Sequence, residues 1–226
     1  MSFVRTTAEL ALRNRQADPA SRRAFEEIVA ECGKASRLLK DMLTLARADA
    51  GNSRLAFEPV DLAEVVKTGC QKAQATIAER GHKLTTAIED GCYAPIWGDY
   101  ASLQRLLWIL VDNAAKYTGA PGTIRVTLSA GEGKATLTVA DNGMGISAAD
   151  LPHIFGRFYR ADPSRSQVEG SGLGLSIALW IANVHQAEIS AESEENAGSV
   201  FRVVFPLLND AGPRTSDASG SLTSVG

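Results

Sequence analysis

The chain has 226 residues and 45% hydrophobic residues, enough for one ordinary domain and a small appendage. Its formal net charge of -3 gives no electrostatic reason to expect nucleic acid as a partner. Its three cysteines are too few for a zinc site or a disulfide framework, and no apolar run approaches the ~20 residues of a membrane helix. We therefore expect a cytoplasmic chain without a membrane segment, compatible with a membrane-anchored parent protein.

The first fifty residues have a helical pattern. We predict a helix over Phe3–Arg15, then a turn at residues 18–21 in which Ser21 is a candidate N-cap. Two helices cannot by themselves bury the apolar stripe that follows, so we predict a helical hairpin over residues 1–51 that forms a homodimeric four-helix bundle. The alternative is that the stripe packs on the rest of this chain. The stripe recurs at three- and four-residue steps: Phe25, Ile28, Val29, Cys32, Ala35, Leu38, Leu39, Met42 and Leu45.

The segment Gly51-Asn52-Ser53 ends the second helix and marks a domain boundary. Over residues 52–206 the pattern predicts an α+β fold: an α/β sandwich with a mixed, mostly antiparallel sheet and helices on one face. The polar residues 207–226 are expected to be a disordered tail. The predicted helices are 61–80, 99–116 and about 172–185, and the predicted strands are 83–89, 123–129, 136–140, 188–193 and 199–205.

The strong helix ending near residue 116 carries the first chemical motif. Asn113 lies within its apolar pattern, where an unpartnered amide costs about 1–3 kcal/mol. The amide oxygen is a ligand suited to Mg²⁺. Lys116 and Tyr117 share its helical face, so they are positioned to neutralise phosphate charge and to pack beside a base. The alternative is a core asparagine beside a solvated lysine.

Asp141 directly follows a predicted strand and begins the second motif. A carboxylate at this position can accept a hydrogen bond from the amino group of adenine. Gly143 and Gly145 allow backbone to approach a planar base without a side-chain clash. An ordinary Asx turn is the alternative interpretation.

The last two motifs flank residues 161–169, which are polar and unpatterned and which we predict to be a mobile lid. Before the lid, residues 154–160 alternate aromatic and basic side chains, so that apolar groups can anchor the segment while Arg157 or Arg160 reaches phosphates. After the lid, the glycine loop 170–174 runs into a helix, whose free N–H groups and dipole favour phosphate. Its spacing fits neither a P-loop nor a Rossmann fingerprint.

In this order, the four motifs strongly resemble the N, G1, F and G2 boxes of bacterial sensor histidine kinases. Residues 38–51, LLKDMLTLARADAG, resemble the second helix of that family's dimerisation and phosphotransfer domain. The resemblance implies ATP and Mg²⁺ as cofactors, with Asn113 as the metal ligand, Asp141 as the reader of adenine, and Asn113 and Lys116 as the catalytic residues. It implies further nucleotide contacts at Lys116, Tyr117, Gly143, Gly145, Ile146, Phe155, Arg157, Phe158, Arg160, Gly170, Ser171, Gly172, Leu173 and Gly174.

The resemblance also implies the reaction: transfer of the γ-phosphoryl group of ATP to a histidine, then relay to a response regulator receiver domain. The family's acceptor histidine lies in a Ser-His-Glu-Leu-Arg-Thr-Pro-like segment, and Met1 aligns just after it. His82, His153 and His185 are poor substitutes, and His185 is expected to cap a helix. One hypothesis is therefore that the ATP domain phosphorylates an intact partner hairpin in trans.

One further departure from the family's pattern and several alternative functions remain open. Gln186-Ala187 stands where the family usually has paired glycines, which leaves the end of the preceding helix undetermined. A non-catalytic ATP-binding dimerisation module that regulates a kinase or a response regulator is the main alternative function. A chaperone, mismatch-repair or topoisomerase ATPase would need a transducer domain for which the chain has no room, and a serine-directed anti-sigma kinase lacks the long bundle helix.

Overall fold

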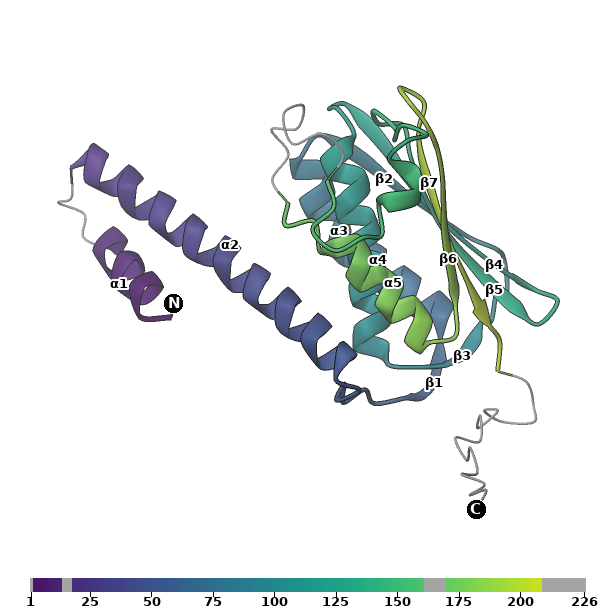
Figure 1. Cartoon of the computed structure of the whole chain (residues 1–226). Coiled ribbons are helices and arrows are strands. Elements are labelled where there is room, and N and C mark those ends of the chain that lie inside the picture. Colours follow the sequence, from purple (N-terminus) through teal and green to yellow (C-terminus); the bar gives the residue numbers. More distant parts are fainter. Residues whose placement is uncertain (1, 14–17, 161–169, 209–226) are drawn as a thin grey trace, which may run out of the picture.

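The computed structural model describes residues 2–13, 18–160 and 170–208 (Figure 1). It consists of a helical hairpin followed by an α/β sandwich, as the sequence predicts. The predicted lid at residues 161–169 lies outside the described residues, as does the predicted tail beyond residue 208. Leu207 and Leu208 still donate backbone hydrogen bonds to Gly133 and Pro95, so the ordered part runs two residues past the predicted boundary.

The hairpin is formed by α1 (Ser2–Arg13) and α2 (Pro19–Asp49). The prediction that Ser21 caps α2 is wrong, because Asp18 is the N-cap and its carboxylate accepts the N–H groups of Ala20 and Ser21 at 3.0 Å. Pro19 then occupies the first helical turn, where its missing N–H costs nothing. At the other end Gly51 adopts the left-handed conformation with φ of 64°, which ends the helix as predicted.

The apolar stripe of α2 is divided between two environments. Figure 1 shows α1 beside the N-terminal half of α2, while the C-terminal half runs on to the sandwich. Leu38 and Leu45 pack against the core of the sandwich, so part of the stripe is covered by this chain itself. Leu39 and Met42, by contrast, are 49% and 45% exposed. The interpretation that the stripe packs on this chain therefore holds for Leu38 and Leu45, and packing of the exposed residues on a second copy stays a prediction.

The sandwich places three helices on one face of a five-stranded sheet. The helices are α3 (Leu62–Glu79), α4 (Tyr100–Tyr117) and α5 (Gly174–Val184). The sheet has the order β2-β4-β5-β7-β6. Only β2 and β4 are parallel, which confirms the mixed, mostly antiparallel sheet. The strands are β2 (His82–Ile88), β4 (Gly122–Gly131), β5 (Lys134–Asp141), β6 (Glu188–Glu194) and β7 (Gly198–Pro206).

Three short elements were not predicted. Strands β1 (Glu58–Asp61) and β3 (Pro95–Gly98) form a two-stranded antiparallel sheet beside the main one. A single 3-10 turn, η1 (Leu151–His153), follows β5. The small sheet begins the sandwich and leads directly into α4, so it fixes where that helix starts.

The core lies between the helices and the sheet. On β4, alternate residues point inward, and Ile124, Val126 and Leu128 are at most 2% exposed. They meet Leu106 and Leu110 of α4, which are fully buried. The apolar positions of α4 that the sequence predicts to share one side are all buried: Leu103, Leu106, Leu107, Leu110 and Ala114.

His185 ends α5 as the predicted C-terminal cap. Its Nδ1 lies 2.7 Å from the carbonyl oxygen of Ile181, and its Nε2 accepts the backbone N–H of Asp99 at 3.0 Å. This pairing requires the proton on Nδ1 and a neutral ring. Burial lowers the pKa of His185, which agrees with the neutral form. The following Gln186 takes the left-handed conformation, with φ of 55°, that glycine usually supplies at this position.

Within the described ranges, no helix is both long enough and apolar enough to cross a membrane.

Candidate nucleotide-binding site

Asp141 is the last residue of β5, and its carboxylate lies at the end of α4. Its Oδ1 accepts the backbone N–H of Gly143 at 2.8 Å and lies 3.5 Å from the hydroxyl of Thr118, the residue that follows α4. Burial raises the pKa of Asp141, while hydrogen bonds from Gly143, Ser199 and Thr118 oppose the increase. A half-buried carboxylate with a partly satisfied acceptor set is suited to receive one more donor from a ligand.

The glycines after Asp141 allow the chain to press against neighbouring backbone. A Cβ on Gly143 would collide with the carbonyl oxygen of Tyr117, and one on Gly145 would collide with that of Glu194. Gly145 also has a φ of 69°. Met144 donates its N–H to Tyr117 at 3.0 Å and accepts that of Asn196 at 2.7 Å. These glycines therefore first serve the packing of this turn between α4 and the β6–β7 hairpin.

Ile146 continues the same segment onto β6. Its N–H donates to the hydroxyl of Ser193 at 2.8 Å, and its side chain is half-buried. The turn from Asp141 to Ile146 is thus held at both ends, which makes it a rigid wall of the site.

The N-terminal end of α5 lies against the same helix α4. A Cβ built on Gly174 would lie 3.5 Å from Cγ2 of Ile109, an ordinary contact distance. Asn113 is four residues after Ile109, so it shares this face of α4 one turn further on. Its side chain has no hydrogen-bond partner among the described residues. A half-buried amide oxygen without a protein partner fits a Mg²⁺ ligand that shares the ion with phosphate oxygens.

The glycine loop before α5 joins the aromatic-arginine segment. Phe158 donates its N–H to the carbonyl oxygen of Gly172 at 3.0 Å, and Gly172 has a φ of 70° with no room for a Cβ beside Phe158. Leu173 is the N-cap residue, and its side chain is buried. The hydroxyl of Ser171 lies 3.4 Å from the N–H of Leu173, while Gly170 is exposed.

Lys116 and Tyr117 occupy the last turn of α4. The Lys116 ammonium lies 2.6 Å from Asp112, whose carboxylate also binds Arg80 at 2.8 Å. Tyr117 is half-buried, and its backbone oxygen holds Met144. Lys116 therefore lies near the site, and its ammonium forms an ion pair with Asp112 on the previous turn of α4.

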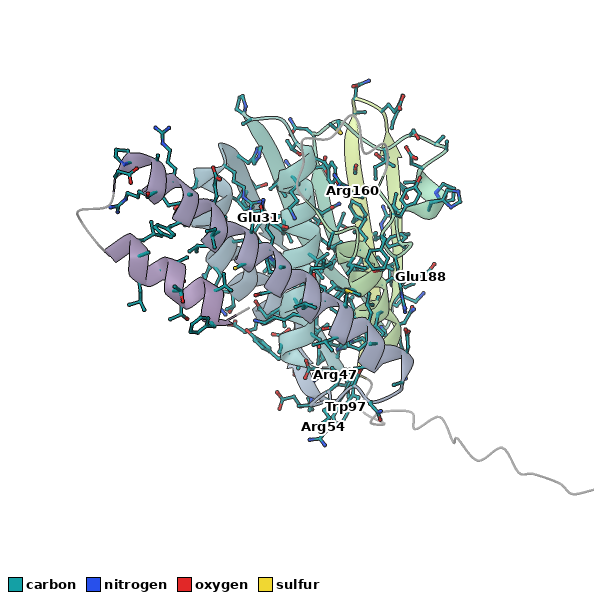
Figure 2. The ribbon with its side chains drawn as sticks, turned by 60° about the vertical axis from the view of Figure 1, so that its left-hand side comes forward. Glu31, Arg47, Arg54, Trp97, Arg160 and Glu188 are labelled. Carbon is teal, nitrogen blue, oxygen red and sulfur yellow. The ribbon has the colours of Figure 1, made fainter. Side chains whose placement is uncertain are left out.

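The aromatic-arginine segment is anchored by some of its apolar residues. Phe155 packs edge-on against Phe201, with ring centroids 6.5 Å apart, and Ile154 is buried, as expected of anchors. Phe158, however, is 58% exposed and has a φ of 60°. The half-buried Arg160 ends this segment (Figure 2).

Arg157 points to the hairpin rather than into the site. Its two terminal nitrogens bind the two carboxylate oxygens of Asp49, at the end of α2, at 2.6 and 2.7 Å. In this arrangement the pair of terminal nitrogens of the guanidinium binds Asp49 in a bidentate way.

The structure thus brings most of the predicted site residues to one region. Helix α4 touches the Asp141 turn through Tyr117 and Thr118, and it touches the start of α5 through Ile109. Sequence reasoning missed Thr118 and Asp112. Asp112 is four residues before Lys116, and this helical spacing was a usable signal for the ion pair.

Comparison with known proteins agrees with this arrangement. Residues 98–209 match the family of histidine kinase-, DNA gyrase B- and HSP90-like ATPases. The signal transduction histidine-protein kinase AfsQ2 of Streptomyces coelicolor is 36% identical over 203 residues, which are 90% of this chain and 36% of AfsQ2. The sensor histidine kinase MtrB of Mycobacterium leprae is 32% identical over 211 residues, 92% of this chain and 37% of MtrB.

The chain belongs to the sensor histidine kinase family. It spans a little over a third of the length of these two relatives. Among solved structures, full-length ShkA in complex with AMPPNP superposes with a TM-score of 0.75 at 25% identity, covering 91% of this chain and 43% of ShkA. The mycobacterial sensor histidine kinase MprB superposes with a TM-score of 0.58 at 25% identity, covering 67% of this chain and 98% of MprB. The similarity to ShkA therefore includes hairpin as well as sandwich.

Proposed function

We propose that this chain is the kinase core of a two-component sensor histidine kinase, which binds Mg·ATP and transfers its γ-phosphoryl group to a histidine for relay to a response regulator receiver domain. The observation that supports it most is the arrangement along α4: the start of α5 contacts Ile109, Asn113 lies on the next turn, and the Asp141 turn lies at the end of the helix. Because ATP is the proposed phosphoryl donor, we infer that the kinase core acts in the cytoplasm.

Each group of the site has a chemical role under this proposal. Asp141 accepts a hydrogen bond from the adenine amino group, and Asn113 offers its oxygen to Mg²⁺. The N–H groups at the start of α5, with the loop 170–174, face phosphate oxygens. Lys116 adds positive charge on the same side. Catalysis by such a set consists mainly of positioning and charge neutralisation.

The hairpin supplies the second half of the proposal. We assign residues 1–51 to a dimerisation hairpin and residues 52–206 to the ATP-binding domain. Met42 and Leu43 are 45% and 54% exposed, and a second hairpin packed in a four-helix bundle would cover them. Homodimerisation through this face is therefore part of the proposed function.

A nucleotide titration tests the binding site. We expect the chain to bind AMPPNP by calorimetry, more tightly with Mg²⁺ present, and Asp141→Asn to lose at least about tenfold in affinity, because it loses the charge that favours the amino group. The variant should fold as well as the parent, since burial already disfavours the charged carboxylate. Asp90→Asn, in an exposed turn after β2, is the matched control. Equal affinities for the two variants would contradict the proposed role of Asp141.

A transfer assay separates a kinase from a non-catalytic module. The chain is mixed with labelled ATP and a homologue that carries an acceptor histidine but a disabled ATP site. Acid-labile, base-stable phosphate on the homologue is the result expected of a kinase acting in trans. Nucleotide binding without any transfer to that hairpin would favour the regulatory module instead.

A further inference from the structure

Two ion pairs connect α2 to the sandwich. In the C-terminal part of the helix, Asp41 binds Arg105 of α4 at 2.6 Å, and the same guanidinium donates to the hydroxyl of Thr44 at 3.1 Å. At the end of the helix, Asp49 binds Arg157 through two hydrogen bonds. Both acids come from the hairpin and both arginines come from the sandwich.

The two pairs flank an apolar contact on one face of α2. Asp41, Leu45 and Asp49 follow one another at four-residue steps, so they lie on the same side of the helix. Leu45 is 4% exposed and belongs to the core of the sandwich. Figure 2, turned so that the hairpin comes forward, shows the lower end of α2 against the sandwich. We call this face of α2 the docking surface: Leu45 is its apolar centre, and the ion pairs of Asp41 and Asp49 lie on either side.

The docking surface is suited to reversible contact. The Arg157 and Asp49 side chains are 49% and 55% exposed, and those of Arg105 and Asp41 are 35% and 27% exposed. Ion pairs with such solvent access are weak and are screened by salt. Few apolar residues of α2 enter the core, so the contact resembles a mobile interface between domains more than a continuous core.

Arg157 links this docking surface to the nucleotide site. Its neighbour Phe158 is hydrogen-bonded to Gly172, in the loop before α5, so Arg157 lies one residue from the proposed phosphate side. Both terminal nitrogens of Arg157 are used by Asp49. A guanidinium bound in this bidentate way cannot offer the same pair of donors to a phosphate.

We propose that Asp49 is a built-in competitor of the nucleotide for Arg157, so that docking of the sandwich on α2 and phosphate binding by Arg157 exclude each other. Nucleotide binding then breaks the ion pair between Asp49 and Arg157 and weakens the contact between α2 and the sandwich. Docking of α2, in turn, lowers the affinity of the site for nucleotide. The inference rests on the proposed nucleotide site and adds a regulation to it.

Affinity measurements test the competition. At low salt we expect Asp49→Asn to bind AMPPNP about three- to tenfold more tightly than the parent chain, because Arg157 is freed. In an Arg157→Gln background the same change should alter the affinity for AMPPNP less than about twofold, because the guanidinium that Asp49→Asn would release is absent. Glu27→Gln removes an exposed carboxylate from the same helix away from the sandwich and serves as the control. No gain from Asp49→Asn beyond the control, or an equal gain in both backgrounds, would overturn the competition.

Distance measurements test the coupling to docking. Spin labels on Ala24→Cys in the hairpin and Glu188→Cys in the sandwich report the distance between the two units, and both positions are exposed. The labelled chain also carries Cys92→Ser and is diluted with unlabelled chain, so that the measured distances lie within one chain. Saturating AMPPNP should broaden and shift the distance distribution, and Asp49→Asn alone should shift it part of the way. A distribution that nucleotide leaves unchanged would overturn the proposal.

A wrong nucleotide site and a wrong Asp49 competition give different experimental results. If the parent chain binds no AMPPNP, the proposed nucleotide site is wrong, whatever the labels show. If it binds AMPPNP normally but neither affinity nor distances respond to Asp49→Asn, the site stands and the Asp49 competition is refuted.

Discussion

The hairpin and the sandwich bury their apolar side chains to different extents. In the sandwich, Leu106, Leu110 and Phe201 are at most 1% exposed, and the helices and sheet cover one another. On the hairpin, Phe3 is 82% exposed and Leu43 is 54% exposed. The sandwich therefore buries its own apolar side chains, whereas the hairpin leaves much of its apolar surface exposed, and the proposed homodimer would cover it. Under that proposal, one chain combines a unit stabilised from within and a unit stabilised by a partner.

A cavity in the sandwich core should give the largest effect. Leu110→Ala removes a fully buried side chain between α4 and the sheet, so we expect a loss of about 3–5 kcal/mol in the free energy of unfolding. Urea denaturation followed by circular dichroism measures it. Leu43→Ala, measured in dilute solution where the hairpin has no partner, should cost less than about 1 kcal/mol. Similar losses in the free energy of unfolding for the two variants would contradict this difference between the sandwich and the hairpin.

A charge on the exposed hairpin face should act on association instead. We expect Leu43→Glu to weaken the homodimer by at least about tenfold, because an apolar contact is replaced by a charge that must be desolvated. Sedimentation equilibrium over a range of concentrations gives the dissociation constant. Glu58→Gln, on the exposed part of β1, is the control. Unchanged association for Leu43→Glu would mean that this face is not the dimer interface.

His185 gives the sandwich a dependence on pH near neutrality, whereas residues 1–51 of the hairpin contain no histidine. His185→Leu leaves the Asp99 N–H without its partner, and the Ile181 carbonyl oxygen keeps only the backbone N–H of residue 185, so we expect a loss of about 2 kcal/mol at neutral pH.

The pH profile identifies the cause. Burial lowers the pKa of His185 in the folded chain below its ordinary value of 6.5. Between those two pKa values the unfolded chain binds more protons, so stability is complete above pH ~6.5 and falls as the pH decreases through that region. Thermal unfolding from pH 8 to pH 5 should show this decrease in the parent chain and a smaller one in His185→Leu. Parallel profiles would refute the neutral cap.

Gln186→Gly should have the smallest effect and the opposite sign. Glycine takes the left-handed conformation of this position without strain, so we expect a gain of about 0.5–1 kcal/mol in the stability of the sandwich. Thermal unfolding measures it, and Asn183→Gly, an exposed position inside α5, should be destabilising by a similar amount. A loss of stability in Gln186→Gly would show that its side chain has a role beyond ending the helix.

Much of the fold could be predicted because periodicity is local. The stripe on α4 and the alternation on β4 each follow from residues close in sequence. Strands β1 and β3 were missed because each has four residues, contains a proline and pairs only with a segment far along the chain. The error at Ser21 arose because two residues able to cap a helix, Asp18 and Ser21, lie three positions apart, and Pro19 at the start of the helix was the neglected signal in favour of Asp18.

The site was predictable to a different degree. Asp141 and the start of α5 could be found because strand ends and glycine loops carry recognisable patterns. The pairing of Arg157 with Asp49 could not, because 108 residues separate them and only the docking of α2 brings them together. The glycines at 143 and 145 were read as making room for a base, whereas in the structure they make room for protein backbone.

The contact between that glycine turn and the β6–β7 hairpin is made mainly by main-chain atoms: Met144 accepts the N–H of Asn196, and Gly145 and Gly198 supply the close approach. The hydroxyl of Ser193 adds one side-chain contact, to the N–H of Ile146. Side chains on the rim, such as those of Glu194, Glu195 and Asn196, take little part in it. Evolution can therefore vary the charge and size of this rim while the wall behind it keeps its shape. The turn proposed to face the base can in this way keep one geometry while the side chains around it change.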